Sequence, residues 1–275
     1  MSREIDVRHL GRAHVICAHE VDGVIVDPGP ASCADTLLEA LDEAPRALLL
    51  THIHLDHAGA AGVLARTFPS LTVYVHERGA PHLIDPSRLL RSAERLYGDQ
   101  MERLWGEVAS VPAERVQALG GGETVEGMRV EYTPGHASHH VSYLHEDSGE
   151  AFVGDVAGVR VPGSTYTVAP TPPPDIDVEA WLGSLETVGE WRPAALCLTH
   201  FGCHRDVDEQ LERLRDGLLE RAEQARTMEP DEFAGWSEAQ TRAAVDGETA
   251  DALIQAAPPE TLGMGLRRYW EKKVS

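Results

Sequence analysis

The chain has 275 residues, of which 42% are hydrophobic and 25% are charged, and its formal net charge is −21. This composition is typical of a folded globular protein with ample core-forming capacity, and so acidic a surface repels phosphate backbones and anionic lipids, which disfavours nucleic-acid and membrane partners. No apolar stretch reaches the roughly 18 residues of a membrane span, the N-terminus lacks a secretory signal pattern, and we therefore expect a cytoplasmic protein.

The first third of the chain alternates short apolar runs with helical periodicity. Strands are predicted at 13–18, 23–26, 47–50 and 71–75, with helices at 34–44 and about 57–66. The run at 47–50 is continuously apolar, as expected for a strand buried on both faces. This alternation predicts a layered α/β architecture.

The rest of the chain divides into three parts. Residues 81–119 show helical spacing and no strand signal, which predicts a helical insertion beside a site. Strand patterns resume at 123–133, 141–144, 151–153 and 194–198, with a helix at 179–188. Residues 206–275 are helical throughout. We therefore expect a catalytic domain over 1–205 and a C-terminal α-helical extension over 206–275 that covers the sheet or mediates self-association.

The four cysteines are scattered. Cys17, Cys33, Cys197 and Cys203 show no C-x-x-C spacing. Their positions predict small buried or loop residues and no disulfide framework.

The stretch LLLTHIHLDHAGA at 48–60 places four coordinating side chains after a buried strand. His52 and His54 are two residues apart, so both can face one metal ion, while Asp56 and His57 turn with the chain toward a second ion. The alternative is a polar loop that happens to be rich in histidine.

Three further signals favour a metal site over that alternative. His136, Asp155 and His200 each follow an apolar run, in VEYTPGHASHH, FVGD and ALCLTH. The ends of strands are where α/β folds collect functional residues. Nitrogen and oxygen ligands without thiolate suit zinc and also accept iron or manganese.

These motifs resemble the metallo-β-lactamase superfamily, from T-H-I-H-L-D-H at 51–57 through G-H-A-S-H-H at 135–140 and G-D at 154–155 to T-H at 199–200. The resemblance covers about residues 5–205 and implies an αββα four-layer sandwich with two divalent metal ions at one edge. It implies that one ion is bound by His52, His54 and His136. The second would be bound by Asp56, His57 and His200, with Asp155 bridging the two.

Other residues receive weaker assignments. His140 and Asp27 are expected to support the ligands without binding metal. Arg160 could hold a substrate carboxylate, although a surface arginine is equally consistent with its position. Tyr166, Tyr97 and Trp105 are candidates for lining the pocket, although aromatic residues at helical spacing more often belong to a core.

The predicted reaction is hydrolysis of a small ester-type substrate by a metal-bound hydroxide, with Asp56 orienting the nucleophile or receiving its proton. A thioester, as in glyoxalase II-like members of the family, is the first hypothesis. A lactonase or phosphodiesterase of the same superfamily is the alternative, and a single-iron persulfide dioxygenase is a further one. From another class, the chain could be a non-catalytic metal-binding or sensor module. The helical tail suggests a homo-oligomer.

Overall fold

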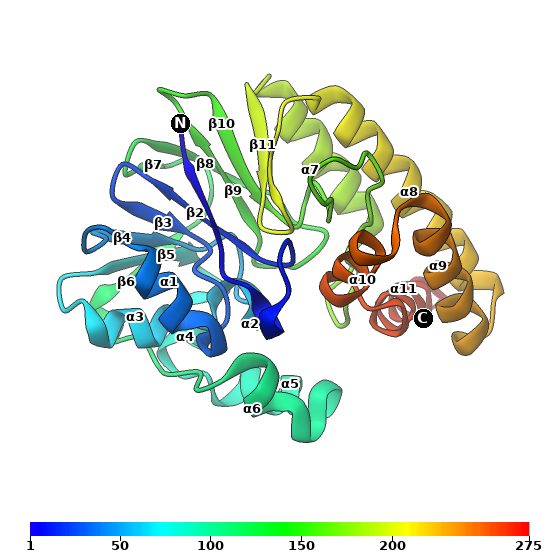
Figure 1. Cartoon of the computed structure of the whole chain (residues 1–275), viewed down its shortest axis with the longest axis horizontal. Coiled ribbons are helices and arrows are strands. Elements are labelled where there is room, and N and C mark those ends of the chain that lie inside the picture. Colours follow the sequence, from blue (N-terminus) through cyan, green and yellow to red (C-terminus); the bar gives the residue numbers. More distant parts are fainter. Residues whose placement is uncertain (275) are drawn as a thin grey trace.

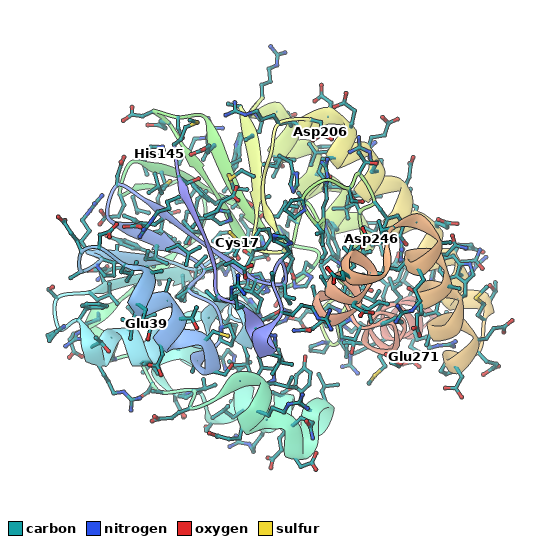
Figure 2. The ribbon with its side chains drawn as sticks, in the orientation of Figure 1. Cys17, Glu39, His145, Asp206, Asp246 and Glu271 are labelled. Atoms are coloured by element: carbon teal, nitrogen blue, oxygen red, sulfur yellow. A yellow bond between two sulfur atoms is a disulfide. The ribbon has the colours of Figure 1, made fainter. Side chains whose placement is uncertain are left out.

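The computed structural model describes residues 1–274 as two six-stranded sheets packed face to face, with helices on their outer faces (Figure 1). Family resemblance predicted this sandwich, and the prediction is confirmed. Acidic side chains such as Glu39, Asp246 and Glu271 lie at the periphery, whereas Cys17 lies in the interior (Figure 2).

The first sheet contains the N-terminal strands in sequence order. Its strands are β1 (Arg3–Asp6), β2 (Cys17–Val21), β3 (Val24–Val26), β4 (Ala47–Leu49), β5 (Thr72–His76) and β6 (Val116–Leu119). Strands β1 to β3 are antiparallel, whereas β3 to β6 run parallel. The parallel strands therefore deliver their carboxyl ends to one edge of the sheet.

The second sheet has the order β12-β11-β10-β9-β8-β7. Its strands are β7 (Thr124–Val125), β8 (Met128–Tyr132), β9 (Val141–His145), β10 (Glu150–Gly154), β11 (Ala195–Leu198) and β12 (Gly202–His204). Strands β10 and β11 are parallel, and the other neighbours are antiparallel.

The helices form the two outer layers and the tail. They are α1 (Ala34–Ala40), α2 (Leu55–Ala58), α3 (Ala61–Thr67), α4 (Ala80–Ile84), α5 (Ser87–Tyr97), α6 (Met101–Trp105), α7 (Val178–Glu190), α8 (Val207–Thr227), α9 (Pro230–Ala244), α10 (Gly247–Ala256) and α11 (Pro259–Val274). In Figure 1, α1 and α3 lie outside the first sheet, and α7 and α8 outside the second. Helices α9 to α11 pack together beside α8. Within residues 1–274, no helix is both long and apolar enough to cross a membrane.

The core explains why β4 is a continuous apolar run. Leu49 packs between the two sheets with residues such as Val130 and Phe152, whereas Leu48 and Leu50 pack on the opposite, helix-covered face. All three leucines are fully buried. A strand buried on both faces holds the following loop rigidly, and that loop begins at Thr51.

The structure corrects three expectations about secondary structure. The segment 81–119 ends in a strand, β6, so it is not helical throughout. Strands β1 and β12 were also not predicted. Each of these strands has only three or four residues, and each gains its stability by pairing with a neighbouring strand.

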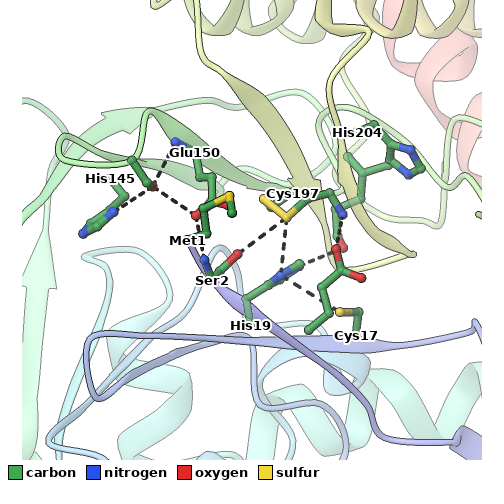
Figure 3. Close-up of a disulfide and its surroundings, with 12 residues drawn as sticks. Met1, Ser2, Cys17, His19, His145, Glu150, Cys197 and His204 are labelled. Atoms are coloured by element: carbon green, nitrogen blue, oxygen red, sulfur yellow. Dashed lines mark hydrogen bonds between the residues drawn. A yellow bond between two sulfur atoms is a disulfide. The ribbon is translucent and has the colours of Figure 1, made fainter.

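The expectation that no disulfide forms was wrong. Cys197 on β11 and Cys203 on β12 are directly opposite each other in the strand register and form a disulfide. Their spacing of six residues places them across the tight turn that joins the two strands. His19 lies beside this disulfide, and its Nδ1 atom is 3.9 Å from Cys203 Sγ and 4.0 Å from Cys17 Sγ (Figure 3).

Candidate metal centre

The predicted ligands lie just beyond the carboxyl ends of four strands. The segment 51–57 follows β4, and His136 follows β8. Asp155 directly follows β10, and His200 lies two residues beyond β11. The sandwich brings these ends together at one edge, so residues as far apart in sequence as Asp56 and His200 become neighbours.

One group of side chains consists of His52, His54, His136 and Asp155. His54 Nδ1 lies 2.9 Å from His52 Nε2 and 3.0 Å from His136 Nε2. Asp155 Oδ2 lies 3.1 Å from His136 Nε2. Three imidazole nitrogens and one carboxylate oxygen thus converge on a common point.

A second group consists of Asp56, His57 and His200. His200 Nε2 lies 3.3 Å from Asp56 Oδ2, and His57 Nε2 lies 3.9 Å from the same oxygen. The other carboxylate oxygen of Asp155, Oδ1, is 3.3 Å from His57 Nε2 and 3.6 Å from His200 Nε2. Asp155 therefore touches both groups, one oxygen to each.

Hydrogen bonds on the outer side of the imidazoles fix which nitrogen faces inward. His136 Nδ1 donates to Pro170 O (2.8 Å), and His200 Nδ1 donates to Val15 O (2.6 Å). His57 Nδ1 donates to Asp27 Oδ2 (2.8 Å). A histidine that donates its outer N–H in this way presents an inner lone pair, which is the usual arrangement at a metal.

Three of the inner atoms, all on the side of the second group, have no hydrogen-bond partner among the described residues. They are the buried atoms His57 Nε2, His200 Nε2 and Asp155 Oδ1. Leaving buried polar atoms unsatisfied costs about 1–3 kcal/mol each, so such a cluster needs an explanation. Two cations that accept these lone pairs supply one, and the donor set of imidazoles and carboxylates suits divalent transition metals.

Asp27 connects the two halves of the site. It is fully buried, and its Oδ1 accepts from the Thr51 backbone N–H (2.8 Å). Its Oδ2 accepts from the hydroxyls of Thr51 and Thr199, each at 2.7 Å, besides the bond from His57. One carboxylate thus fixes the loop after β4 and the turn after β11. Asp27 was expected to support the ligands; it bonds directly to His57 and also to the threonines that precede His52 and His200.

His140 lies behind the ligands. Its Nδ1 is 2.9 Å from Thr133 Oγ1, and its ring stacks on that of His52. Gly154 makes this packing possible, because a Cβ there would lie 2.8 Å from His140 Nε2 and 2.4 Å from Thr51 Oγ1. Gly154 also has φ +48°, a conformation that favours glycine.

Burial and neighbouring charges shift the pKa values of His54 and His57 in opposite directions. Burial, together with neighbouring His136, lowers the pKa of His54 to about 3, so that ring is neutral and able to bind metal. Burial also lowers the pKa of His57, but the carboxylates of Asp155, Asp56 and Asp27 outweigh it and raise that pKa well above the usual value. The His57 side of the centre therefore carries the stronger negative field.

A pocket of about 350 Å³ opens onto the inner side of this cluster. His54, Asp56 and Asp155 lie at its inner end. Its walls come from α5 and α6, from the proline-rich loop 170–175, and from the junction of α10 and α11. Tyr97 and Trp105 line it, as anticipated. The C-terminal helices thus form part of the pocket as well as covering the sheet.

The two weaker substrate-contact predictions are not supported. Arg160 is buried and is held by Asp206 (2.8 Å), Gln210 (3.1 Å) and Ser164 O (2.6 Å). Tyr166 accepts a bond from Arg221. Neither Arg160 nor Tyr166 belongs to the described pocket lining. The sequence position of Arg160, five residues after Asp155, does not reveal that Asp206 on the approach to α8 lies next to it.

Several relevant residues were not singled out from sequence. Thr51 and Thr199 each precede a predicted ligand, so the repeated T-H dipeptide was a usable signal. Arg78, His82 and Arg88 also line the pocket. No local pattern marks them, because only the packing of the insertion places them there.

Comparison with known proteins gives a consistent result. A family model described as the metallo-beta-lactamase superfamily matches residues 9–200. The chain is 31% identical over 207 residues to the metallo-beta-lactamase fold-containing protein ST1585 of Sulfurisphaera tokodaii, covering 72% of this chain and 75% of that protein.

The crystal structure of ST1585 superimposes with a TM-score of 0.73 at 25% identity, over 97% of this chain and 98% of that one. A shorter match, 41% identical over 75 residues, links the chain to hydroxyacylglutathione hydrolase of Salmonella paratyphi A. It covers 25% of this chain and 29% of that enzyme.

Proposed function

The chain belongs to the metallo-beta-lactamase superfamily, and from that premise we propose that it is a dinuclear metal-dependent hydrolase of small thioesters. The observation that carries the proposal is the position of Asp155. Its two oxygens face two separate ligand groups, as a carboxylate bridging two ions must.

In this proposal His52, His54 and His136 hold one ion, and Asp56, His57 and His200 hold the other. Zinc is the first choice for both positions, with iron or manganese as the alternatives, since the ligands are nitrogen and oxygen without thiolate. When bound, such ions polarise a substrate carbonyl and lower the pKa of water.

Asp56 is the proposed catalytic residue of the chain. It lines the pocket, and its carboxylate is oriented by His200 at 3.3 Å. Although burial opposes ionisation, neighbouring His57 and His200 hold the pKa of Asp56 below its usual range, so it is a carboxylate at neutral pH. It can hold an attacking water by accepting a hydrogen bond and can receive its proton.

Two observations support a thioester as the substrate. The local match to hydroxyacylglutathione hydrolase is one. The other is the apolar pocket wall, which suits the hydrocarbon parts of an acyl thioester better than a phosphodiester backbone. The C-terminal lysines are engaged elsewhere: Lys272 donates to Pro174 O, and Lys273 pairs with Glu179. A glutathione-like ligand would therefore need other cations.

The test is turnover of a panel of thioesters, lactones and phosphodiesters by protein loaded in turn with zinc, manganese or iron, alongside metal quantification. We expect two ions per chain and preferential thioester hydrolysis. Asp155→Ala should lower metal content and abolish turnover. No bound metal and no hydrolysis with any of the three ions would refute the enzyme assignment. Preferential lactone or phosphodiester turnover would refute the thioester assignment.

A further inference from the structure

The pocket lining is mostly apolar, whereas its two arginines, Arg78 and Arg88, are exposed to solvent, which places them at the mouth. The apolar lining comes from two sides, with Leu89, Ala93, Leu96 and Trp105 on the insertion and Ala257, Pro258 and Leu262 on the tail. In Figure 1 these two sides are α5–α6 and α10–α11. Arg78, His82 and Arg88 also line the pocket, outside the metal centre.

Arg78 is held in place by neutral groups. Its Nη1 donates to Tyr132 Oη (3.1 Å) and more weakly to Ser138 O (3.4 Å), and its guanidinium lies over the Tyr132 ring at 5.6 Å. No carboxylate among the described residues pairs with it. Its positive charge therefore remains available to a ligand.

Arg88 has fewer contacts with the rest of the protein than Arg78 has. It lies in the first turn of α5, is exposed, and makes no hydrogen bond or ion pair with any residue in 1–274. By contrast, Arg66 forms a two-point bond to Glu107 at the base of the same insertion. In a chain of net charge −21, an arginine without an acidic partner at a pocket mouth is a ready anion contact.

One carboxylate of the lining competes with a ligand for these arginines, and it already accepts a hydrogen bond. Asp175 is the only carboxylate of the described lining that lies outside the metal centre. The hydroxyl of Ser138 donates to it at 2.6 Å. Outside the metal centre, the described lining therefore has two exposed guanidinium groups, Arg78 and Arg88, and one hydrogen-bonded carboxylate.

We propose that the pocket selects thioesters that carry a carboxylate at the end remote from the scissile carbonyl, with Arg88 as the specificity-determining contact and Arg78 adding a second positive charge. This rests on the proposed thioester hydrolase function. The carbonyl reaches Asp56, an apolar chain lies between Leu89 and Leu262, and the terminal carboxylate meets the planar guanidinium fork of Arg88.

Binding tests the proposal without turnover. The probes are mercaptohexanoate and its neutral carboxamide, because a thiolate binds metal at the inner end while the other end reaches toward the mouth. Calorimetry on zinc-loaded protein should show the carboxylate binding about tenfold more tightly than the amide, the lower end for a charge-assisted contact. Arg88→Gln should abolish that preference. Arg95→Gln, the same change on an exposed position of α5 outside the lining, should retain it.

Turnover of the acetyl thioesters of the two probes distinguishes the anion contact from the proposed thioester hydrolase activity on which it rests. If wild type hydrolyses both thioesters and binds both thiols equally well, the anion contact is refuted and the hydrolase stands. If wild type hydrolyses neither but prefers the carboxylate in binding and loses that preference with Arg88→Gln, the contact stands and the thioester assignment fails. A preference that survives Arg88→Gln refutes the role of Arg88.

Discussion

Replacing Asp27 by Asn should weaken one metal position while leaving the fold intact. Asn keeps the shape of Asp27 and one acceptor oxygen, which can still take the Thr51 backbone N–H. The other oxygen becomes an N–H donor, and it then faces His57 Nδ1, itself a donor at 2.8 Å. His57 can avoid this clash only by moving its proton to Nε2, which removes the inner lone pair.

The magnitude follows from the role of such supporting bonds. Loss of a group that orients a ligating histidine costs about 10- to 100-fold in metal affinity, or roughly 1.4–2.7 kcal/mol. The two threonine hydroxyls can rotate to accept from the new amide, so we expect only about 1–3 kcal/mol of destabilisation for one disrupted buried bond. Asp27→Ala leaves four donors without their acceptor and should cost on the order of 4 kcal/mol, about 1 for each donor.

The assay is a chelator titration of zinc-loaded protein, with metal content measured by mass spectrometry and unfolding followed by circular dichroism. Asp27→Asn should release the first zinc equivalent at a lower chelator concentration than wild type and retain the second. Asp35→Asn, the same charge change at an exposed position on α1, is the matched control. If Asp27→Asn is folded and holds both ions as tightly as wild type does, Asp27 does not set the orientation of His57.

Four further predictions test neighbouring parts of the structure. His136→Ala should lower metal content and activity more than His140→Ala, because His140 lies outside both ligand groups; the reverse order would mean that the wrong histidine was assigned. Arg160→Gln should lower stability by about 2 kcal/mol, a value reduced for solvent screening because the Asp206 side chain is one-third exposed. The same change should leave KM unchanged. Burial raises the pKa of Asp206, but hydrogen bonds from Arg160 and Arg213 outweigh it and lower that pKa from 3.8 to about 2. The ionised carboxylate therefore stabilises the fold above pH 4, and this stabilisation is lost as the pH falls toward 2. Urea unfolding at several pH values should show the stability difference between wild type and Asp206→Asn closing over that window. Gly265→Ala places a Cβ 2.0 Å from Thr171 O, which should shift α11, lower stability by roughly 1–3 kcal/mol and raise KM with metal content unchanged; an unaltered melting temperature would contradict this.

Sequence reasoning was most successful where local pattern and chemistry coincide. The continuous apolar run at 47–50 identified a strand buried on both faces, and β4 is such a strand. The seven proposed ligands follow strand ends, and the structure gathers all of them into two adjoining groups. Their roles as ligands stay predictions that metal analysis must test, as does self-association through the tail.

The misses share a physical cause, which is dependence on residues far away in sequence. The strand β6 has only four residues, two of them exposed, and it exists because β5 offers its edge. The disulfide requires the register of β11 against β12. Arg160 has no local sign that Asp206 neutralises it. The pocket walls likewise arise only when the insertion and the tail fold against the same edge.

The walls of the pocket have a consequence for how the protein could change over evolution. The family match ends at residue 200, yet Ala257 and Leu262 line the pocket from beyond that point. The seven proposed ligands lie just beyond strand ends that the core fixes, whereas the pocket walls lie largely on α5, α6, α10 and α11, none of which carries a proposed ligand. Substitutions or exchanges in α5, α6, α10 and α11 can therefore alter which molecule is admitted while the reactive centre is conserved, so grafting these helices from a relative is a direct route to a changed specificity.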